Sequence, residues 1–151
     1  MLRGFYSGSR PCLKLFIQKI NSRVEDRYLV IDAIIDTGFD GFVMVNPKHA
    51  KALGWANHPA KGNSRVTIAD GSSSSVSLMQ HPVKVGSKSS KEIRGMCLFS
   101  ENPRAPCLIG MDYLRRAKLV LLISVKGIVL IEEDKLSEGV RIKVEPVVNP
   151  H

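Results

Sequence analysis

The chain has no hydrophobic run long enough to cross a membrane as a helix. Its longest apolar stretch, residues 118–131, is interrupted by Ser124, Lys126 and Gly127. A spanning helix needs ~20 consecutive apolar residues. The first ten residues also lack the apolar core of a secretory signal peptide. We therefore expect no membrane association and a location in the cytoplasm.

Cysteine is scarce, and the three cysteines do not have the spacing of a metal site. Cys12, Cys97 and Cys107 are odd in number, far apart and without metal-ligand spacing. Disulfide frameworks normally use an even number of cysteines. We interpret the three as small buried or half-buried thiols in a reducing compartment, which also favours the cytoplasm. One disulfide plus a free thiol is the less favoured alternative.

Aromatic residues make up only 6% of a chain that is otherwise basic, with a net charge of +8 and a pI near 9.6. A basic balance permits nucleic-acid binding. The basic residues are scattered, however, with local clusters only at Arg115–Arg116 and Lys88–Lys91, and aromatic residues do not interleave with them. Nucleic acid is therefore an unfavoured partner, and that hypothesis predicts binding that weakens steeply with added salt.

Short strands dominate the predicted secondary structure of a chain whose 151 residues amount to one domain. Asn46 as N-cap and Pro47 in the first turn predict a short helix over residues 48–53, and a second is predicted over residues 112–117. We expect an all-β domain over residues 1–138, followed by a strand or tail over residues 139–151. Apolar runs and alternation predict strands over residues 12–17, 27–35, 42–45, 64–69, 72–85, 93–99, 108–110, 119–124 and 128–131.

The most informative motif is Asp36-Thr37-Gly38, which ends the apolar run of residues 29–35. A buried strand fixes the position of the carboxylate, and Gly38 lets another chain approach closely. By itself the tripeptide is also compatible with an ordinary turn. The chain contains this tripeptide once. A site that needs two such carboxylates would therefore require two copies of the chain.

Residues 33–38, Ala-Ile-Ile-Asp-Thr-Gly, together with the later Leu108-Ile109-Gly110-Met111-Asp112, resemble the retropepsin-like (clan AA) aspartic peptidases. The resemblance covers roughly residues 12–132. It implies an all-β fold, the closed β-barrel or double-psi acid-protease half, with one or two short helices. Phe39 replaces the usual Ala or Ser after the glycine, a form similar to a small subgroup of cellular, prokaryotic members.

The resemblance implies a homodimeric aspartic endopeptidase that acts on peptide or protein substrates without metal or cofactor. Asp36 is then the catalytic residue, and one copy from each subunit activates a water molecule. Thr37 and Gly38 complete the active loop, with Thr37 reaching across the dimer. Ile109 and Gly110 are structural residues next to the site, Gly110 through close packing behind the active loop.

The resemblance also implies a flap that closes over the substrate. We assign it to the hairpin of residues 64–85, with a tip at Asp70, Gly71 and Ser72, where Asp-Gly is a strong hairpin turn signal. A plain solvent-exposed hairpin is the alternative. For the dimer contact we expect residues 140–148 to supply a strand, because the first ten residues look poorly suited to one.

Two further carboxylates are interpreted as structural. Asp32 lies on the same strand face as Asp36, and we expect a solvated or hydrogen-bonded strand residue. The resemblance implies that Asp112 caps the second helix. A second possible function keeps the same fold as a catalytically idle or very selective peptide-binding or assembly module. Replacing Asp36 by Asn separates the two, since only the enzyme would lose its function.

Overall fold

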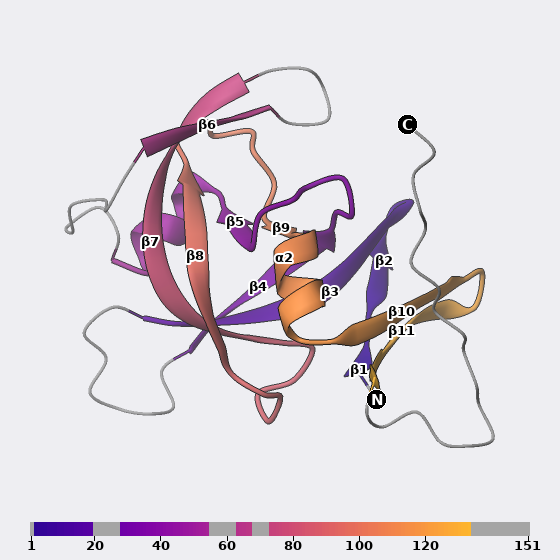
Figure 1. The fold of residues 1–151 in the computed structure, drawn as a ribbon. Helices are drawn as coiled ribbons and strands as arrows, with labels where there is room; N and C mark the ends of the chain where they lie inside the picture. The colour runs from indigo at the N-terminus through magenta and orange to yellow at the C-terminus, as the bar shows by residue number, and fades with distance from the viewer. Residues whose placement is uncertain (1, 20–27, 55–62, 68–72, 134–151) are drawn as a thin grey trace, which may run out of the picture.

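Two β-sheets and two short helices make up the computed structural model, which describes residues 2–19, 28–54, 63–67 and 73–133 (Figure 1). No helix in these ranges is long and apolar enough to span a bilayer. In chain order the elements are β1 (Leu2–Arg3), β2 (Phe5–Ser7), β3 (Arg10–Gln18), β4 (Tyr28–Ile35), β5 (Val43–Val45), α1 (Pro47–Ala52), β6 (Asn63–Thr67), β7 (Ser73–Val85), β8 (Ile93–Ser100), β9 (Leu108–Ile109), α2 (Met111–Arg116), β10 (Leu119–Ser124) and β11 (Gly127–Glu132).

The larger sheet closes on itself. Its strand order is β2-β3-β4-β9-β5-β8-β7-β6, and an additional pairing of β3 with β7 joins strands from its two ends. Strands β3, β4, β9, β5, β8 and β7 therefore form a ring, as Figure 1 shows. A closed ring leaves few free strand edges. The predicted all-β class with short helices is confirmed.

Alternation along β3 and β4 builds the core inside this ring. Leu13, Leu15 and Ile17 of β3 are fully buried, while Ile31 and Ile35 of β4 are at most 5% exposed. Residues of β3 and β4 pair antiparallel, with Leu15 opposite Ile31. Burying one such side chain contributes about 1.5–3 kcal/mol. The core therefore rests on the period-two pattern that is visible in the sequence.

Two strands within residues 2–7, β1 and β2, were not predicted from the sequence. β1 pairs with β11, with Leu2 opposite Leu130, and β2 pairs with β3. Gly4 lies between them, and a Cβ there would come within 2.6 Å of the Cys12 carbonyl oxygen. Here Gly4 permits close contact, and Gly8 turns the chain with a φ of 62°.

Both helices have the predicted length and begin one residue earlier than predicted. Asn46 caps α1 as predicted, because its side-chain oxygen accepts a hydrogen bond of 3.0 Å from the His49 N–H. The predicted cap of α2 is wrong. Gly110 is its N-cap residue and makes no side-chain cap bond, while Asp112 pairs with Arg116 at 3.6 Å.

The cysteines are buried and free, as predicted. Cys12, Cys97 and Cys107 form no disulfide. Burial raises the pKa of each thiol, that of Cys107 to about 11 and that of Cys97 further still. A thiolate is the reactive form of cysteine, so these side chains serve as small apolar core groups.

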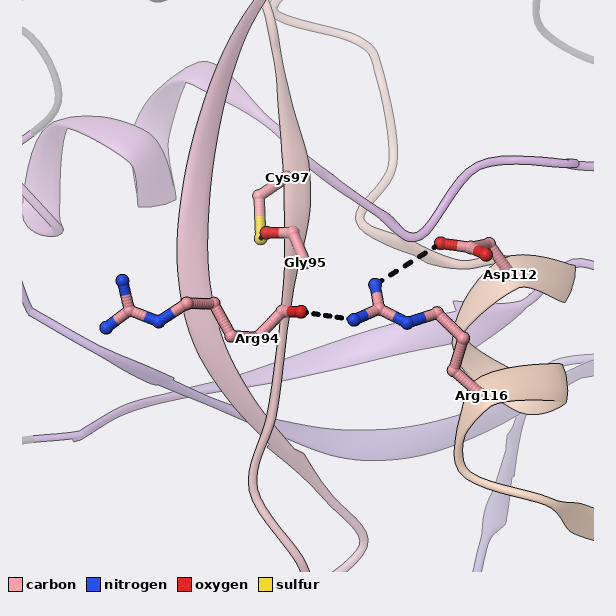
Figure 2. A network of polar contacts seen from close by, with 5 residues as sticks. All are labelled: Arg94, Gly95, Cys97, Asp112 and Arg116. Atoms are coloured by element: carbon pink, nitrogen blue, oxygen red, sulfur yellow. Dashed lines mark hydrogen bonds and ion pairs between the residues drawn. The ribbon is translucent and has the colours of Figure 1, made fainter.

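Phe42 is the centre of the packing between α2 and β8. Its ring lies 5.2 Å from that of Tyr113 in a stacked arrangement, and the Arg116 guanidinium lies over it at 5.2 Å. Figure 2 shows Arg116 reaching from α2 toward β8, where it donates a hydrogen bond of 2.5 Å to the Arg94 carbonyl. A Cβ on Gly95 would lie 2.3 Å from the Phe42 ring. The absence of a side chain at Gly95 thus makes room for Phe42.

The smaller sheet, in the order β1-β11-β10, ends in an apolar edge strand. Leu122 and Ile123 at the end of β10 are 40% and 55% exposed, and Val125 in the following turn is fully exposed. Figure 1 shows this hairpin (orange to yellow) extending from the end of α2. Apolar edge strands are a common site of association between chains.

We expect Gly95→Ala to destabilise the fold by about 1–3 kcal/mol, because the new methyl group overlaps the Phe42 ring and forces it to move. Urea unfolding followed by circular dichroism measures the change. Adding Phe42→Leu to this variant should recover part of the loss, since the smaller side chain leaves space. Equal stability of Gly95→Ala and wild type would refute the packing described for Phe42.

Candidate functional site

Asp36 is the first residue after β4, and neighbouring backbone holds it in place. β4 runs parallel to β9, with Ile34 opposite Leu108 and Ile35 opposite Ile109. The Asp36 N–H then donates a hydrogen bond of 2.9 Å to the Ile109 carbonyl. The sheet ladder therefore continues through the backbone of Asp36, although its side chain lies beyond the strand.

The Asp36 carboxylate is half-buried and faces a short exposed turn. One of its oxygens accepts a hydrogen bond of 3.0 Å from the Gly38 N–H. The Asp36 carbonyl accepts another, of 3.1 Å, from the Phe39 N–H. Thr37 and Gly38 are exposed. A Cβ on Gly38 would lie 3.3 Å from the carboxylate oxygen. The turn thus holds the carboxylate in one orientation and leaves it accessible.

β9 and the start of α2 support the loop that follows β4. β9 lies between β4 and β5, parallel to the first and antiparallel to the second. The first N–H groups of α2 then bond to the loop: Met111 donates to the Phe39 carbonyl at 2.8 Å, and Asp112 to the Gly41 carbonyl at 3.1 Å. N–H groups at a helix start have no partner within the helix. Here the active loop supplies their acceptors.

Gly110 lies where these two segments cross. A Cβ at this position would come within 2.1 Å of the Gly41 carbonyl oxygen and 2.8 Å of the Phe39 carbonyl oxygen. Its N–H donates to the Phe42 carbonyl at 3.0 Å. Ile109 is fully buried in the main core. The structure therefore places both residues directly behind the loop that carries Asp36.

Phe39, the departure from the usual motif, packs against the loop itself. It is half-buried and belongs to a small cluster with Met44, Ala105 and Leu108. A Cβ on Gly41 would lie 2.4 Å from the Phe39 ring. The ring therefore packs against the backbone of Gly41 and Gly110. Sequence analysis did not anticipate this role of Gly41, although the glycine two residues after a large aromatic was a visible signal.

The structure describes only part of the predicted flap hairpin and none of the predicted dimer strand. β6 and β7 pair antiparallel, with Thr67 opposite Ser73, so the predicted hairpin is present. Its predicted tip, Asp70, Gly71 and Ser72, lies outside the described residues. So do the segment 140–148 and the predicted boundary between residues 138 and 139.

Asp32 and His49 do not join Asp36 in a cluster. Asp32 is exposed and forms an ion pair with Lys14 across β3 and β4, as expected for a strand carboxylate. His49 lies on α1, and burial together with the nearby Lys48 lowers its pKa. The described residues contain no group of three or more His, Cys, Asp or Glu side chains with the geometry of a metal site.

Solved structures with a similar fold are retropepsin-like. A retropepsin-like aspartic protease from Rickettsia conorii matches with a TM-score of 0.61 and 18% identity, over 87% of this chain and 97% of that one. The retroviral protease-like domain of Ddi1 from Leishmania major matches with a TM-score of 0.52 and 15% identity, over 86% of this chain and 100% of that domain. At these identities the likeness concerns the fold.

Sequence comparison identifies the family. No curated protein matches the chain in sequence. The profile of one family, described as "gag-polyprotein putative aspartyl protease", matches residues 20–116, well over half of the chain. The match contains the Asp36-Thr37-Gly38 turn, β9 and α2. The chain therefore belongs to the gag-polyprotein aspartyl protease family and has the retropepsin-like fold of the aspartic proteases.

Proposed function

We propose that this protein is a homodimeric aspartic endopeptidase, in which two Asp36 carboxylates, one per subunit, activate a water molecule for peptide-bond hydrolysis. One observation carries the proposal: Asp36 is fixed at the end of β4 by the Ile109 carbonyl, while its carboxylate stays accessible in an exposed turn. The chain has a single Asp-Thr-Gly. Two carboxylates therefore require two chains.

The chemistry follows from placing two like charges close together. Two neighbouring carboxylates cannot both ionise cheaply, so the pair holds one proton, as is well established for aspartic proteases. The ionised carboxylate removes a proton from water, whose oxygen attacks the scissile carbonyl carbon. The protonated carboxyl group donates its proton to the carbonyl oxygen. Breakdown of the tetrahedral intermediate transfers a proton to the leaving nitrogen, without a covalent enzyme intermediate.

Several features of the loop suit this role. The hydrogen bond from the Gly38 N–H orients one carboxylate oxygen, which leaves the other for water or the second carboxylate. Thr37 is exposed and, in the proposed dimer, reaches the loop of the second copy. The β6–β7 hairpin would close over a bound peptide, with Asp70, Gly71 and Ser72 at its tip. Closure excludes water from such a site.

We also place the active protein in the cytoplasm. Three free, buried cysteines support this proposal, because a reducing compartment keeps thiols unpaired.

The first test is the substitution Asp36→Asn. It keeps the side-chain shape and an oxygen that can accept from the Gly38 N–H, but removes the ionisable group. We expect cleavage of a diverse peptide library, assayed by mass spectrometry from acid to neutral pH, to fall at least about 100-fold. Asp32→Asn is the matched control, since Asp32 lies on the same strand and pairs with Lys14; it should retain activity.

Either of two results would contradict the proposal. Equal cleavage by wild type and the Asp36→Asn variant would show that the carboxylate is not catalytic. The absence of cleavage by a folded wild-type dimer, together with unchanged peptide binding by the variant, would instead indicate a peptide-binding or assembly module with the same fold.

Shared catalysis predicts dominant inhibition. When wild type exchanges subunits with an excess of Asp36→Asn chains, most wild-type chains enter mixed dimers that hold one Asp36 carboxylate. We expect activity per wild-type chain to fall in proportion to the share of wild-type chains. An equal excess of catalytically active Asp32→Asn chains should not reduce it. Activity that is independent of the added Asp36→Asn chains would indicate a site complete within one chain.

The proposed dimer strand can be tested by truncation after Glu138. If residues 140–148 supply the contact, sedimentation velocity should show the truncated protein as a monomer, and cleavage should be lost. A truncated protein that stays dimeric would make that assignment wrong. Ile123→Lys, on the exposed edge of β10, should leave the dimer intact if residues 140–148 alone form the contact.

A further inference from the structure

A cavity of about 210 Å³ lies at the C-terminal end of α2. The active loop binds the other end of this helix, through Met111 and Asp112. The cavity is therefore separate from the proposed catalytic site. Its described walls come from β1, the end of β7, the start of β8 and the turn before it, α2 and the β10–β11 hairpin.

Positive charge exceeds negative charge in this wall. The described wall includes Lys91, Arg116 and Lys118 but only one acidic residue, Glu132. Arg116 already pairs with Asp112 and bonds to the Arg94 carbonyl, so its guanidinium is held in place. Lys91 and Lys118 make no ion pair within the described part of the chain. Two of the cations are thus available to an anion.

Ser90 adds an unsatisfied polar group. Its hydroxyl oxygen is buried and has no hydrogen-bond partner among the residues that the structure describes. The Ser90 backbone is tied down, because its N–H donates to the Ser87 carbonyl at 3.1 Å. A buried hydroxyl without a partner is costly and rare in folded proteins. A bound ligand that accepts a hydrogen bond would satisfy it.

Lys118 adds an independent observation. It is the only non-glycine residue with positive φ in the described part of the chain, at 51°. It follows the C-cap of α2, and its N–H donates to the Arg115 carbonyl at 3.1 Å. Glycine is the usual residue at this position, because a side chain is strained there. This backbone conformation sets the direction in which the Lys118 side chain leaves the main chain at the wall of the cavity.

We propose that this cavity binds a small organic monoanion, a carboxylate with a compact apolar body. Ser90 and Lys118 would donate to the carboxylate, while Leu2, Ile93 and Leu119 would pack against the body. A volume of about 210 Å³ suits a ligand the size of a small aromatic acid. The proposal does not depend on the activity of Asp36.

The apolar residues of the wall and Tyr113 narrow the choice of ligand. Leu2, Ile93 and Leu119 offer no hydrogen bond to the oxygens of inorganic phosphate, which favours a carboxylate with an apolar body. Tyr113 is 2% exposed. Its burial, and to a smaller extent the nearby charge of Glu132, raises the pKa of its hydroxyl. The phenol therefore stays protonated and adds no charge to the wall.

The experiment is a titration of the full-length protein with benzoate, followed by amide chemical shifts in heteronuclear NMR. We expect saturable shifts around Ser90 and Lys118 at concentrations up to about 10 mM. Benzamide has the same shape without the charge and should bind more weakly, as should inorganic phosphate. Stronger binding of phosphate than of benzoate would overturn the assignment of an organic monoanion.

Two variants test the residues without disturbing the fold. Lys118→Gly relieves the strained backbone, so it should be at least as stable as wild type, yet weaken benzoate binding about tenfold. Ser90→Ala removes an unpaired hydroxyl and should also weaken binding. Lys126→Ala removes the same charge from the exposed β10–β11 turn and should bind like wild type. No saturable benzoate binding to wild type, or equal binding by Lys118→Gly, would overturn the proposal.

Discussion

The insertion of β9 between β4 and β5 is the constraint on which the rest of the structure depends. Two residues, Leu108 and Ile109, pair parallel to one strand and antiparallel to the other. This crossing completes the closed ring and supplies the carbonyl that holds Asp36. It requires two backbones to approach more closely than a Cβ on Gly110 would allow. A single glycine thus connects barrel closure to the position of the carboxylate.

The position of β9 also places α2, a helix of only six residues, against the active loop. The first N–H groups of α2 bond to loop carbonyls, and its last residues line the basic cavity. Between these ends, Tyr113 and Arg116 enclose the Phe42 ring. Short helices have little stability alone. Packing against the active loop and β8 therefore stabilises α2, and α2 in turn supports the loop.

Local patterns made much of this fold predictable. Asn46 and Pro47 indicated α1 because a cap acts within one turn, and alternation in residues 12–17 indicated β3 because burial on one face repeats every second residue. The prediction failed where the signal was tertiary. No strand was predicted before residue 12, but pairing with distant β11 and with β3 forms β1 and β2 within residues 2–7.

The sequence by itself determined the family, most of the strands and the residue that carries the proposed chemistry. Each is encoded in short stretches of consecutive residues, such as Asp36-Thr37-Gly38. Only the tertiary structure decided how distant segments meet: the support of Asp36 by Ile109, the space that Gly95 leaves for Phe42, and the cavity lined by Ser90 and Lys118. These relations join residues far apart in the chain. Spacing along a sequence does not specify which backbones will meet, because that depends on the packing of the whole barrel.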